Sequence, residues 1–228
     1  SISELCKQHN LKLAVDNTFM SPYGQSPLSL GADIVMHSTT KFIGGHSDII
    51  GGALITNNKQ LAEKLYFIQK SGGAVPSPFD CWMLLRSTKT LGLRFQKQSD
   101  NALELANRLN SHEKIGSVIY PGLSSHPQFN LATKQQLNPN NQPIYGSMIS
   151  IKLGSIAKRD SFLNKLELFK LAESLGGVES LVCVPFEMTH GSVPTDMKIK
   201  MGLTEDLVRL SVGIEHIDDL YFDLDQSL

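Results

Sequence analysis

Two short apolar segments, each followed at once by polar residues, restrict the fold of this chain more than any other feature. Residues 11–15 are Leu-Lys-Leu-Ala-Val and lead into Asp16 and Asn17, and a second, largely apolar run spans residues 32–36. Runs of this kind are typical of short buried strands in a parallel sheet. In open α/β sheets the ligand crevice lies at the carboxyl ends of the strands. The pattern predicts an α/β fold with a binding site at these two strand ends.

The second run leads into a cluster of hydroxyls and a single lysine. Residues 38–40 are Ser-Thr-Thr, Lys41 follows, and a Gly-Gly turn occupies residues 44–45. Pyridoxal 5'-phosphate (PLP) needs a lysine for its aldehyde, hydroxyls for its phosphate and glycines where the backbone turns. Taken alone, Lys41 is better explained as a solvated surface residue, and Asp16 as a helix cap or turn residue. Together they favour PLP, because a carboxylate keeps the pyridine nitrogen protonated.

Composition limits the possible partners. The chain has 228 residues, enough for one or two domains, and a net charge of −1. We expect no nucleic-acid or membrane partner, because there is no basic field, no apolar run of bilayer length and no signal peptide. Three scattered cysteines fit a reducing cytosol, and the seven histidines lack metal-ligand spacing. We therefore expect a cytoplasmic protein without a metal.

Periodicity predicts the remaining elements. The first ten residues read as the end of a helix, and a long helical segment from Asp80 to about Leu109 breaks near Gly92. The other predicted strands are 51–56, 118–120, 147–153, 168–171 and 208–211, and the other predicted helices are 58–70, 156–165 and 217–227. Residues 137–146 read as a tolerated surface insertion. We expect one domain over residues 1–87 and a smaller α+β domain over 88–228, linked by the long helix.

These motifs resemble those of the Cys/Met-metabolism PLP-dependent enzymes, the cystathionine synthase and lyase family. Residues 33–47 resemble the PLP-attachment signature of the family, and Val-Asp-Asn-Thr-Phe (15–19) precedes it at the family's spacing. Further similar segments are 74–80, 120–123, 171–181, 188–190 and 208–215. The resemblance implies the C-terminal part of an aminotransferase-like (fold type I) large domain followed by a smaller α+β domain. We expect a longer enzyme, whose stacking tyrosine and cross-subunit phosphate residues lie outside this chain.

The resemblance also implies how the cofactor is held. It identifies Lys41 as the lysine that binds PLP covalently and then acts as the base on the substrate Cα proton. Asp16 is implied to face the pyridine nitrogen, and Ser38 and Thr40 to bind the phosphate. Thr39 lies one position out of phase with both hydroxyls and is expected to point elsewhere.

Three residues near the end of the chain are implied to bind substrate. Arg209 lies in an apolar strand, where an unpaired guanidinium is costly, so a structural salt bridge is the alternative to binding a substrate carboxylate. Ser174 is implied to lie near the lysine amine. Glu173 matches a glutamate of the γ-synthases and γ-lyases and would suit the distal ammonium of cystathionine; the alternative is an exposed loop charge.

The activity implied by the resemblance is transsulfuration of a small amino-acid substrate. We expect a carbon-sulfur lyase that performs γ-elimination on L-cystathionine to give cysteine, 2-oxobutyrate and ammonia, because residues 74–80, 125–128 and 223–226 are more similar to lyases. The alternative is a cystathionine γ-synthase, which joins cysteine to an O-acyl-homoserine. A truncated, non-catalytic subunit is a third interpretation, against which the intact site residues argue. The full-length protein is expected to be a homo-oligomer, a tetramer formed as a dimer of dimers.

Overall fold

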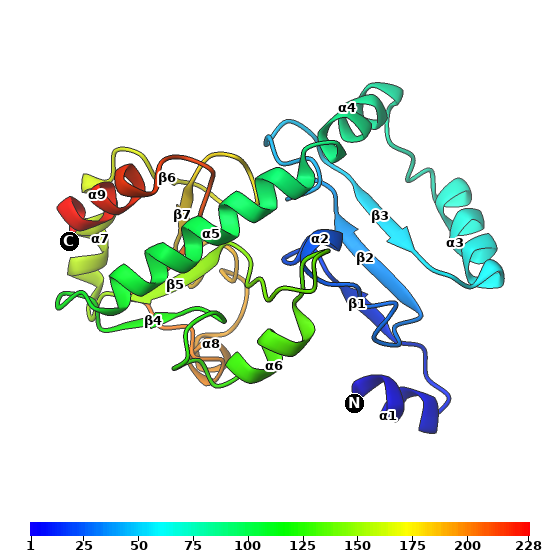
Figure 1. Cartoon of the computed structure of the whole chain (residues 1–228), viewed down its shortest axis with the longest axis horizontal. Coiled ribbons are helices and arrows are strands. Elements are labelled where there is room, and N and C mark those ends of the chain that lie inside the picture. Colours follow the sequence, from blue (N-terminus) through cyan, green and yellow to red (C-terminus); the bar gives the residue numbers. More distant parts are fainter.

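A computed structural model describes residues 1–228, which form two β-sheets with one long helix lying between them (Figure 1). The first sheet has the order β1 (Ala14–Asp16), β2 (Ile34–Ser38) and β3 (Gly52–Ile55). β1 runs parallel to β2, and β3 runs antiparallel to it. The register pairs Asp16 with Met36, so β1 and β2 end at the same edge of the sheet. The mixed α/β fold is as predicted.

The first strand is shorter and less buried than the sequence predicts. Leu11 is 60% exposed, and the pairing with β2 begins only at Ala14. In this chain β1 has β2 as its single neighbour, and Leu11 lies before the residues that pair with β2.

Four helices accompany this sheet: α1 (Ile2–Gln8), α2 (Ser21–Gly24), α3 (Lys59–Gly72) and α4 (Pro78–Thr88). Asn58 caps α3 by accepting a hydrogen bond from the backbone N–H of Leu61. α3 buries none of its residues and stands apart from the sheet at the edge of the molecule (Figure 1). Its apolar face is therefore not used within this chain.

The second sheet has five strands in the order β4 (Ser117–Ile119), β5 (Met148–Lys152), β8 (Leu207–Ser211), β7 (Leu181–Cys183) and β6 (Lys170–Leu171). Only β6 and β7 are parallel. The main core packs the sheet against α5 (Leu91–Asn110), α7 (Ile156–Lys165) and α9 (Ile217–Ser227). The central strand β8 is almost completely buried, which is typical of a strand covered on both faces.

α5 connects the two cores. Phe95, near its start, belongs to a small cluster with Met20 and Phe42, whereas Leu105 and Leu109 belong to the main core. The break between α4 and α5 falls at residues 89–90, slightly before the predicted position at Gly92. Whether the chain divides into domains at residue 87 stays a prediction.

Several elements differ from the prediction. β7, α2, α6 (Phe129–Gln135) and α8 (Thr195–Lys200) were not predicted, and each has seven residues or fewer. The interpretation of residues 137–146 as a mere surface insertion is wrong. Ile144 is 2% exposed and packs in the cluster around Phe95, and the buried Asn138 accepts hydrogen bonds from two backbone N–H groups of the loop. The loop is therefore an ordered, partly buried part of the fold.

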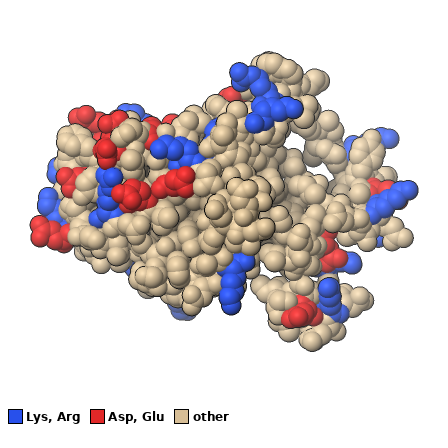
Figure 2. Space-filling view, viewed as in Figure 1, with Lys and Arg blue, Asp and Glu red and all other residues tan.

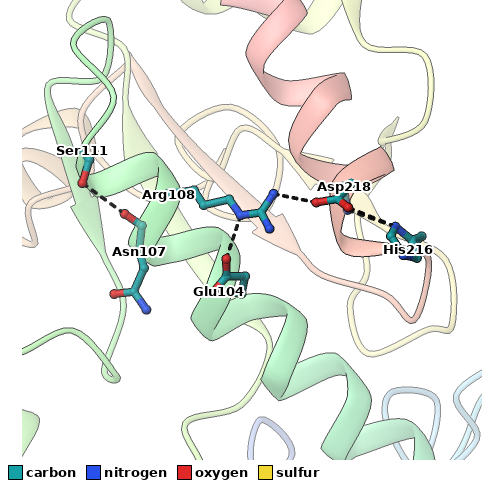
Figure 3. Close-up of polar contacts among 6 residues, drawn as sticks. All are labelled: Glu104, Asn107, Arg108, Ser111, His216 and Asp218. Atoms are coloured by element: carbon teal, nitrogen blue, oxygen red, sulfur yellow. Dashed lines mark hydrogen bonds and ion pairs between the residues drawn. The ribbon is translucent and has the colours of Figure 1, made fainter.

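A polar network on the surface fastens α9 to α5 (Figure 3). The Arg108 guanidinium donates to Glu104 on its own helix and to Asp218 at the start of α9, at 2.8 Å in both cases. Arg108 holds the pKa of the Asp218 carboxyl below its ordinary value. Acidic and basic side chains interleave over the face in Figure 2, without a continuous field of one sign. None of the helices is long and apolar enough to span a bilayer.

Candidate functional site

Lys41 lies on a tight turn directly after β2. The N–H of Gly44 donates to the carbonyl of Thr39 at 2.8 Å, and the N–H of Gly45 donates to the carbonyl of Lys41 at 2.7 Å. Gly45 has a φ of +70°, which glycine adopts at little cost. The Lys41 ammonium donates to the hydroxyl of Ser174 at 3.1 Å and makes no ion pair. The structure thus brings together two predicted site residues that are 133 positions apart.

The loop that carries Ser174 packs directly on the Lys41 turn. Ser174 has a φ of +146°, a conformation that costs a residue with a side chain of order 1–3 kcal/mol. Gly176 has a φ of +79°, and a Cβ atom there would lie 2.7 Å from the backbone nitrogen of Phe42. The N–H of Val178 donates to the carbonyl of Gly45 at 3.0 Å. Strain of this kind persists only where the surroundings enforce it, and it is concentrated at functional sites.

Asp16 lies at the same sheet edge, and its carboxylate makes only one hydrogen bond within the chain. One carboxylate oxygen accepts a hydrogen bond from the N–H of Thr18 at 2.9 Å, and no cation pairs with it. The Thr18 hydroxyl in turn accepts from the N–H of Ser38 at 2.8 Å. Asp16 and Ser38 are therefore held next to each other, with the side chain of Asp16 exposed.

The three hydroxyls before Lys41 have different surroundings. Ser38 is half-buried at the end of β2. Thr40 accepts a hydrogen bond from the N–H of Gly51 at 3.0 Å and lies at the cleft beside Ser174. Thr39 is buried and its hydroxyl has no partner, so its side chain points into the protein rather than toward the cleft.

An open cleft of about 680 Å³ lies beside Ser174 and Thr40. Glu173 lies in its wall, so Glu173, Ser174 and Thr40 meet in one cavity. Three further carboxylates line it, and no lysine or arginine does; they are Asp48, Asp80 and Glu179. The cleft is suited to a ligand with a positively charged end.

Arg209 projects from the centre of the second sheet, between Ser150 on β5 and Cys183 on β7. Its Nε atom is buried without a hydrogen-bond partner, and no carboxylate forms a salt bridge with it. Burial raises the pKa of the Cys183 thiol, and the nearby Arg209 opposes that rise. The structure shows no salt bridge to Arg209 within this chain, and its binding of a substrate carboxylate stays a prediction.

His37 is buried on β2, and its pKa lies below the ordinary value because burial disfavours the imidazolium, while Asp16 acts in the opposite direction. The stability that neutral His37 provides is complete above the unfolded-state pKa of about 6.5 and is lost as the pH falls through the lower folded-state pKa. We expect the free energy of unfolding to decrease between pH 7.5 and 5.5, and less so in His37→Gln. Urea titrations at three pH values measure the free energy of unfolding. The same change with pH in the wild type and in His37→Gln would contradict the prediction.

Sequence reasoning missed two residues that support the site. Arg94 and Gln98 are buried in α5 and donate to backbone carbonyls next to Lys41 and Ser174. Polar residues at helical spacing are normally assigned to the exposed face of a helix, so the sequence pattern alone placed Arg94 and Gln98 in solvent.

Comparison with known proteins decides the family. The model of the Cys/Met metabolism PLP-dependent enzyme family matches residues 1–228. The chain belongs to this family. The family's description names PLP as the cofactor of its members.

The relatives of this chain are named for three different activities. The chain is 51% identical over 229 residues to cystathionine gamma-lyase of Dictyostelium discoideum and 48% identical over 230 residues to cystathionine gamma-synthase of Mycobacterium leprae. It is 46% identical over 227 residues to cystathionine beta-lyase of Lactococcus lactis. Each alignment covers the whole chain, which spans 57% or 58% of the relative's length.

The fold agrees with solved structures of the family. The crystal structure of cystathionine gamma-lyase from Lactobacillus plantarum complexed with L-serine superposes with a TM-score of 0.94 at 41% sequence identity. The superposition covers 99% of this chain and 58% of that chain. The mixed α/β fold is therefore shared with these enzymes over the matched part.

Proposed function

We propose that this protein is a PLP-dependent transsulfuration enzyme of the cytoplasm that converts L-cystathionine and water, by γ-elimination, into cysteine, 2-oxobutyrate and ammonia. The observation that carries the proposal is the placement of the Lys41 amine, which has a neutral hydroxyl as its partner and lies beside an acidic cleft. A carboxylate partner would hold the lysine in an ion pair, and the Lys41 amine has no such partner.

The residues present fit PLP, since an amine without an ion-pair partner and a partly unpaired carboxylate lie at one sheet edge, and a buried arginine donor lacks a partner. Lys41 would hold the cofactor covalently, Asp16 would face its ring nitrogen, and Ser38 and Thr40 would bind its phosphate. When bound, PLP supplies an electron sink for a carbanion at the amino-acid Cα.

The chain's own residues then handle the proton and the substrate. The Lys41 amine takes the Cα proton, a task that requires the neutral amine, and the Ser174 hydroxyl holds that amine in place. Arg209 binds the substrate carboxylate through its planar guanidinium. Glu173 binds the distal ammonium of cystathionine in the acidic cleft.

Cystathionine γ-synthesis is the second candidate, favoured by the 48% identity to the enzyme of M. leprae. The two activities are separated by assaying the native protein first with cystathionine alone and then with cysteine plus O-succinylhomoserine. Release of 2-oxobutyrate from cystathionine supports the lyase. Cystathionine formation without such release would replace the lyase by the synthase.

Borohydride reduction followed by peptide mapping tests the cofactor assignment directly. Reduction fixes a lysine-bound PLP as a stable pyridoxyl group, so we expect the label on the peptide that contains Lys41. A label on any other lysine would contradict the proposal, whichever substrate the protein uses.

Asp16→Ala is expected to separate cofactor attachment from turnover. Lys41 should still be labelled after reduction, because the carboxylate is not part of the covalent bond. Turnover should fall about 10²-fold, the usual loss when one charge-stabilising contact is removed. Steady-state rates and the labelled fraction measure the two effects. A rate within twofold of the wild type would remove Asp16 from the proposed site.

We also infer that residues 1–87 belong to a PLP-binding domain of fold type I and residues 88–228 to a smaller α+β domain. The two separate sheets and the helix between them support this division. A homotetramer is supported by the exposed apolar residues on α4, which include Phe79, Trp82 and Leu85.

A further inference from the structure

One face of α5 buries three polar side chains in a row, Arg94, Gln98 and Asn101. They are 5%, 0% and 2% exposed. Spacings of four and three residues place them on the same side of the helix. Buried polar groups need hydrogen-bond partners, and these three find theirs in backbone carbonyls outside the helix. We call them the α5 donor row.

Arg94 holds the turn that carries Lys41. Its guanidinium donates to the carbonyls of Phe42 at 2.8 Å and Ile43 at 3.2 Å, the two residues after Lys41. It also donates to the carbonyl of Ser87 at 3.0 Å, in the last turn of α4. Arg94 forms no ion pair, and burial lowers its pKa. Its Nε atom donates to the Thr90 hydroxyl at 3.1 Å, so two of its four hydrogen bonds hold the backbone after Lys41 and two hold the junction of α4 and α5.

Gln98 holds the loop that carries Ser174. Its amide nitrogen donates to the carbonyl of Gly177 at 2.6 Å and to that of Gly176 at 3.4 Å. Its amide oxygen is buried without a partner. Exchanging the oxygen and nitrogen would place the oxygen against two carbonyls, so the orientation is fixed by the loop.

Arg94 and Gln98 therefore hold the two segments whose side chains, Lys41 and Ser174, contact each other. Lys41 and Ser174 meet at 3.1 Å, and the segments behind them are held by donors one helical turn apart. Asn101 continues the row by donating to the carbonyls of Gly213 and Glu215, beyond the strand that carries Arg209.

We propose that Arg94 and Gln98 are positioning residues that set the Lys41 amine against the Ser174 hydroxyl. The inference rests on the proposed function for the identity of the reactive amine. Loss of either donor leaves buried carbonyls unpaired, and the strained Ser174 backbone then relaxes away from the lysine. Misplacement of a reacting group by about 1 Å costs on the order of 10²-fold in rate, so substrate binding should suffer less than kcat.

Gln98→Glu provides a sharp test because it preserves the side-chain shape. A carboxylate at this position is repelled by the two glycine carbonyls, whereas a protonated carboxyl donates to one of them. Burial raises the pKa of such a carboxyl and the Arg94 guanidinium one helical turn away opposes that rise, so the donor returns once the pH falls below the resulting pKa. We expect the kcat of the variant, relative to the wild type at the same pH, to fall about 10- to 100-fold at pH 8.5 and to recover toward pH 6. Gln98→Met, without a donor, should show the loss at both pH values.

Hydrogen exchange in the native protein without substrate supplies a readout independent of activity. We expect faster exchange in segments 39–46 and 174–178 of Gln98→Met than of the wild type. Arg108→Gln is the matched control, since it removes a donor of the same helix that serves α9 instead (Figure 3). It should change neither kcat nor exchange in these segments.

The outcomes separate this inference from the proposed function. The positioning role would be overturned if both Gln98 variants kept the wild-type kcat at pH 8.5 and pH 6. It would also be overturned if Gln98→Met lost activity while hydrogen exchange in segments 39–46 and 174–178 stayed unchanged. If Gln98→Met does not fold, the pH recovery of Gln98→Glu carries the test by itself. If borohydride labels no lysine in the wild type, the proposed function fails, while faster exchange in the variant still supports the role of Gln98 in holding the two segments together.

Discussion

Lys41→Ala is expected to abolish turnover and to remove the borohydride label together. The variant lacks the amine that binds the cofactor and takes the Cα proton, and removal of a group that performs the chemistry itself costs about 10³-fold or more. The Lys41 side chain makes one hydrogen bond, to Ser174, so the fold should tolerate its loss. Steady-state rates and peptide mapping measure both effects, and circular dichroism checks the fold.

The matched control for Lys41 is Lys97→Ala. Lys97 is an exposed lysine of α5. This variant should keep the wild-type rate and the label on Lys41. A Lys41→Ala protein that retains more than about a tenth of the wild-type kcat would exclude the proposed role of the lysine.

Gly176→Ala is expected to destabilise the fold and to weaken the Lys41–Ser174 contact. The left-handed backbone conformation costs an alanine about 1–2 kcal/mol. A Cβ atom 2.7 Å from the Phe42 nitrogen adds an overpacking cost of about 1–3 kcal/mol, because the obstacle is backbone and cannot move aside. We therefore expect a loss of about 2–5 kcal/mol in the free energy of unfolding and a lower kcat.

Gly202→Ala separates the two contributions to this loss. Gly202 has a φ of +78°, almost equal to the +79° of Gly176, but no atom lies within 4 Å of the position of its missing Cβ. Its substitution should carry the conformational cost alone. Denaturant unfolding of both variants gives the difference, and equal losses would show that the close approach to Phe42 contributes nothing.

The sequence predicted best those elements that have their own local signals. The bounds of α7 and α9 agree with the predicted helices, because capping residues precede both and their apolar residues keep a helical period. β7 and α8 were missed because segments of three and six residues contain too few positions to establish a period. The exposure of Leu11 could not be predicted, since the burial of a side chain depends on the segments that pack against the strand and not on the strand's own sequence.

The site divides in the same way. Asp16 and Lys41 were recognisable from the sequence because Asp16 directly follows one apolar run and Lys41 follows the hydroxyl cluster at the end of the other. The contact between Lys41 and Ser174 spans 133 positions, and only the resemblance to a known family pointed to it. Arg94 and Gln98 were missed, because their partners are carbonyls of distant segments and carbonyls carry no sequence signal.

The position of α5 has a consequence for how this protein loses its structure. Phe95 completes one hydrophobic cluster and Leu105 and Leu109 complete the other, all on one uninterrupted helix. Unfolding of α5 as a whole removes packing from both clusters, so the two parts of the chain should unfold in a single cooperative transition. The catalytic geometry would then survive intact up to that transition, with no partly unfolded species in which one sheet persists and the other is lost.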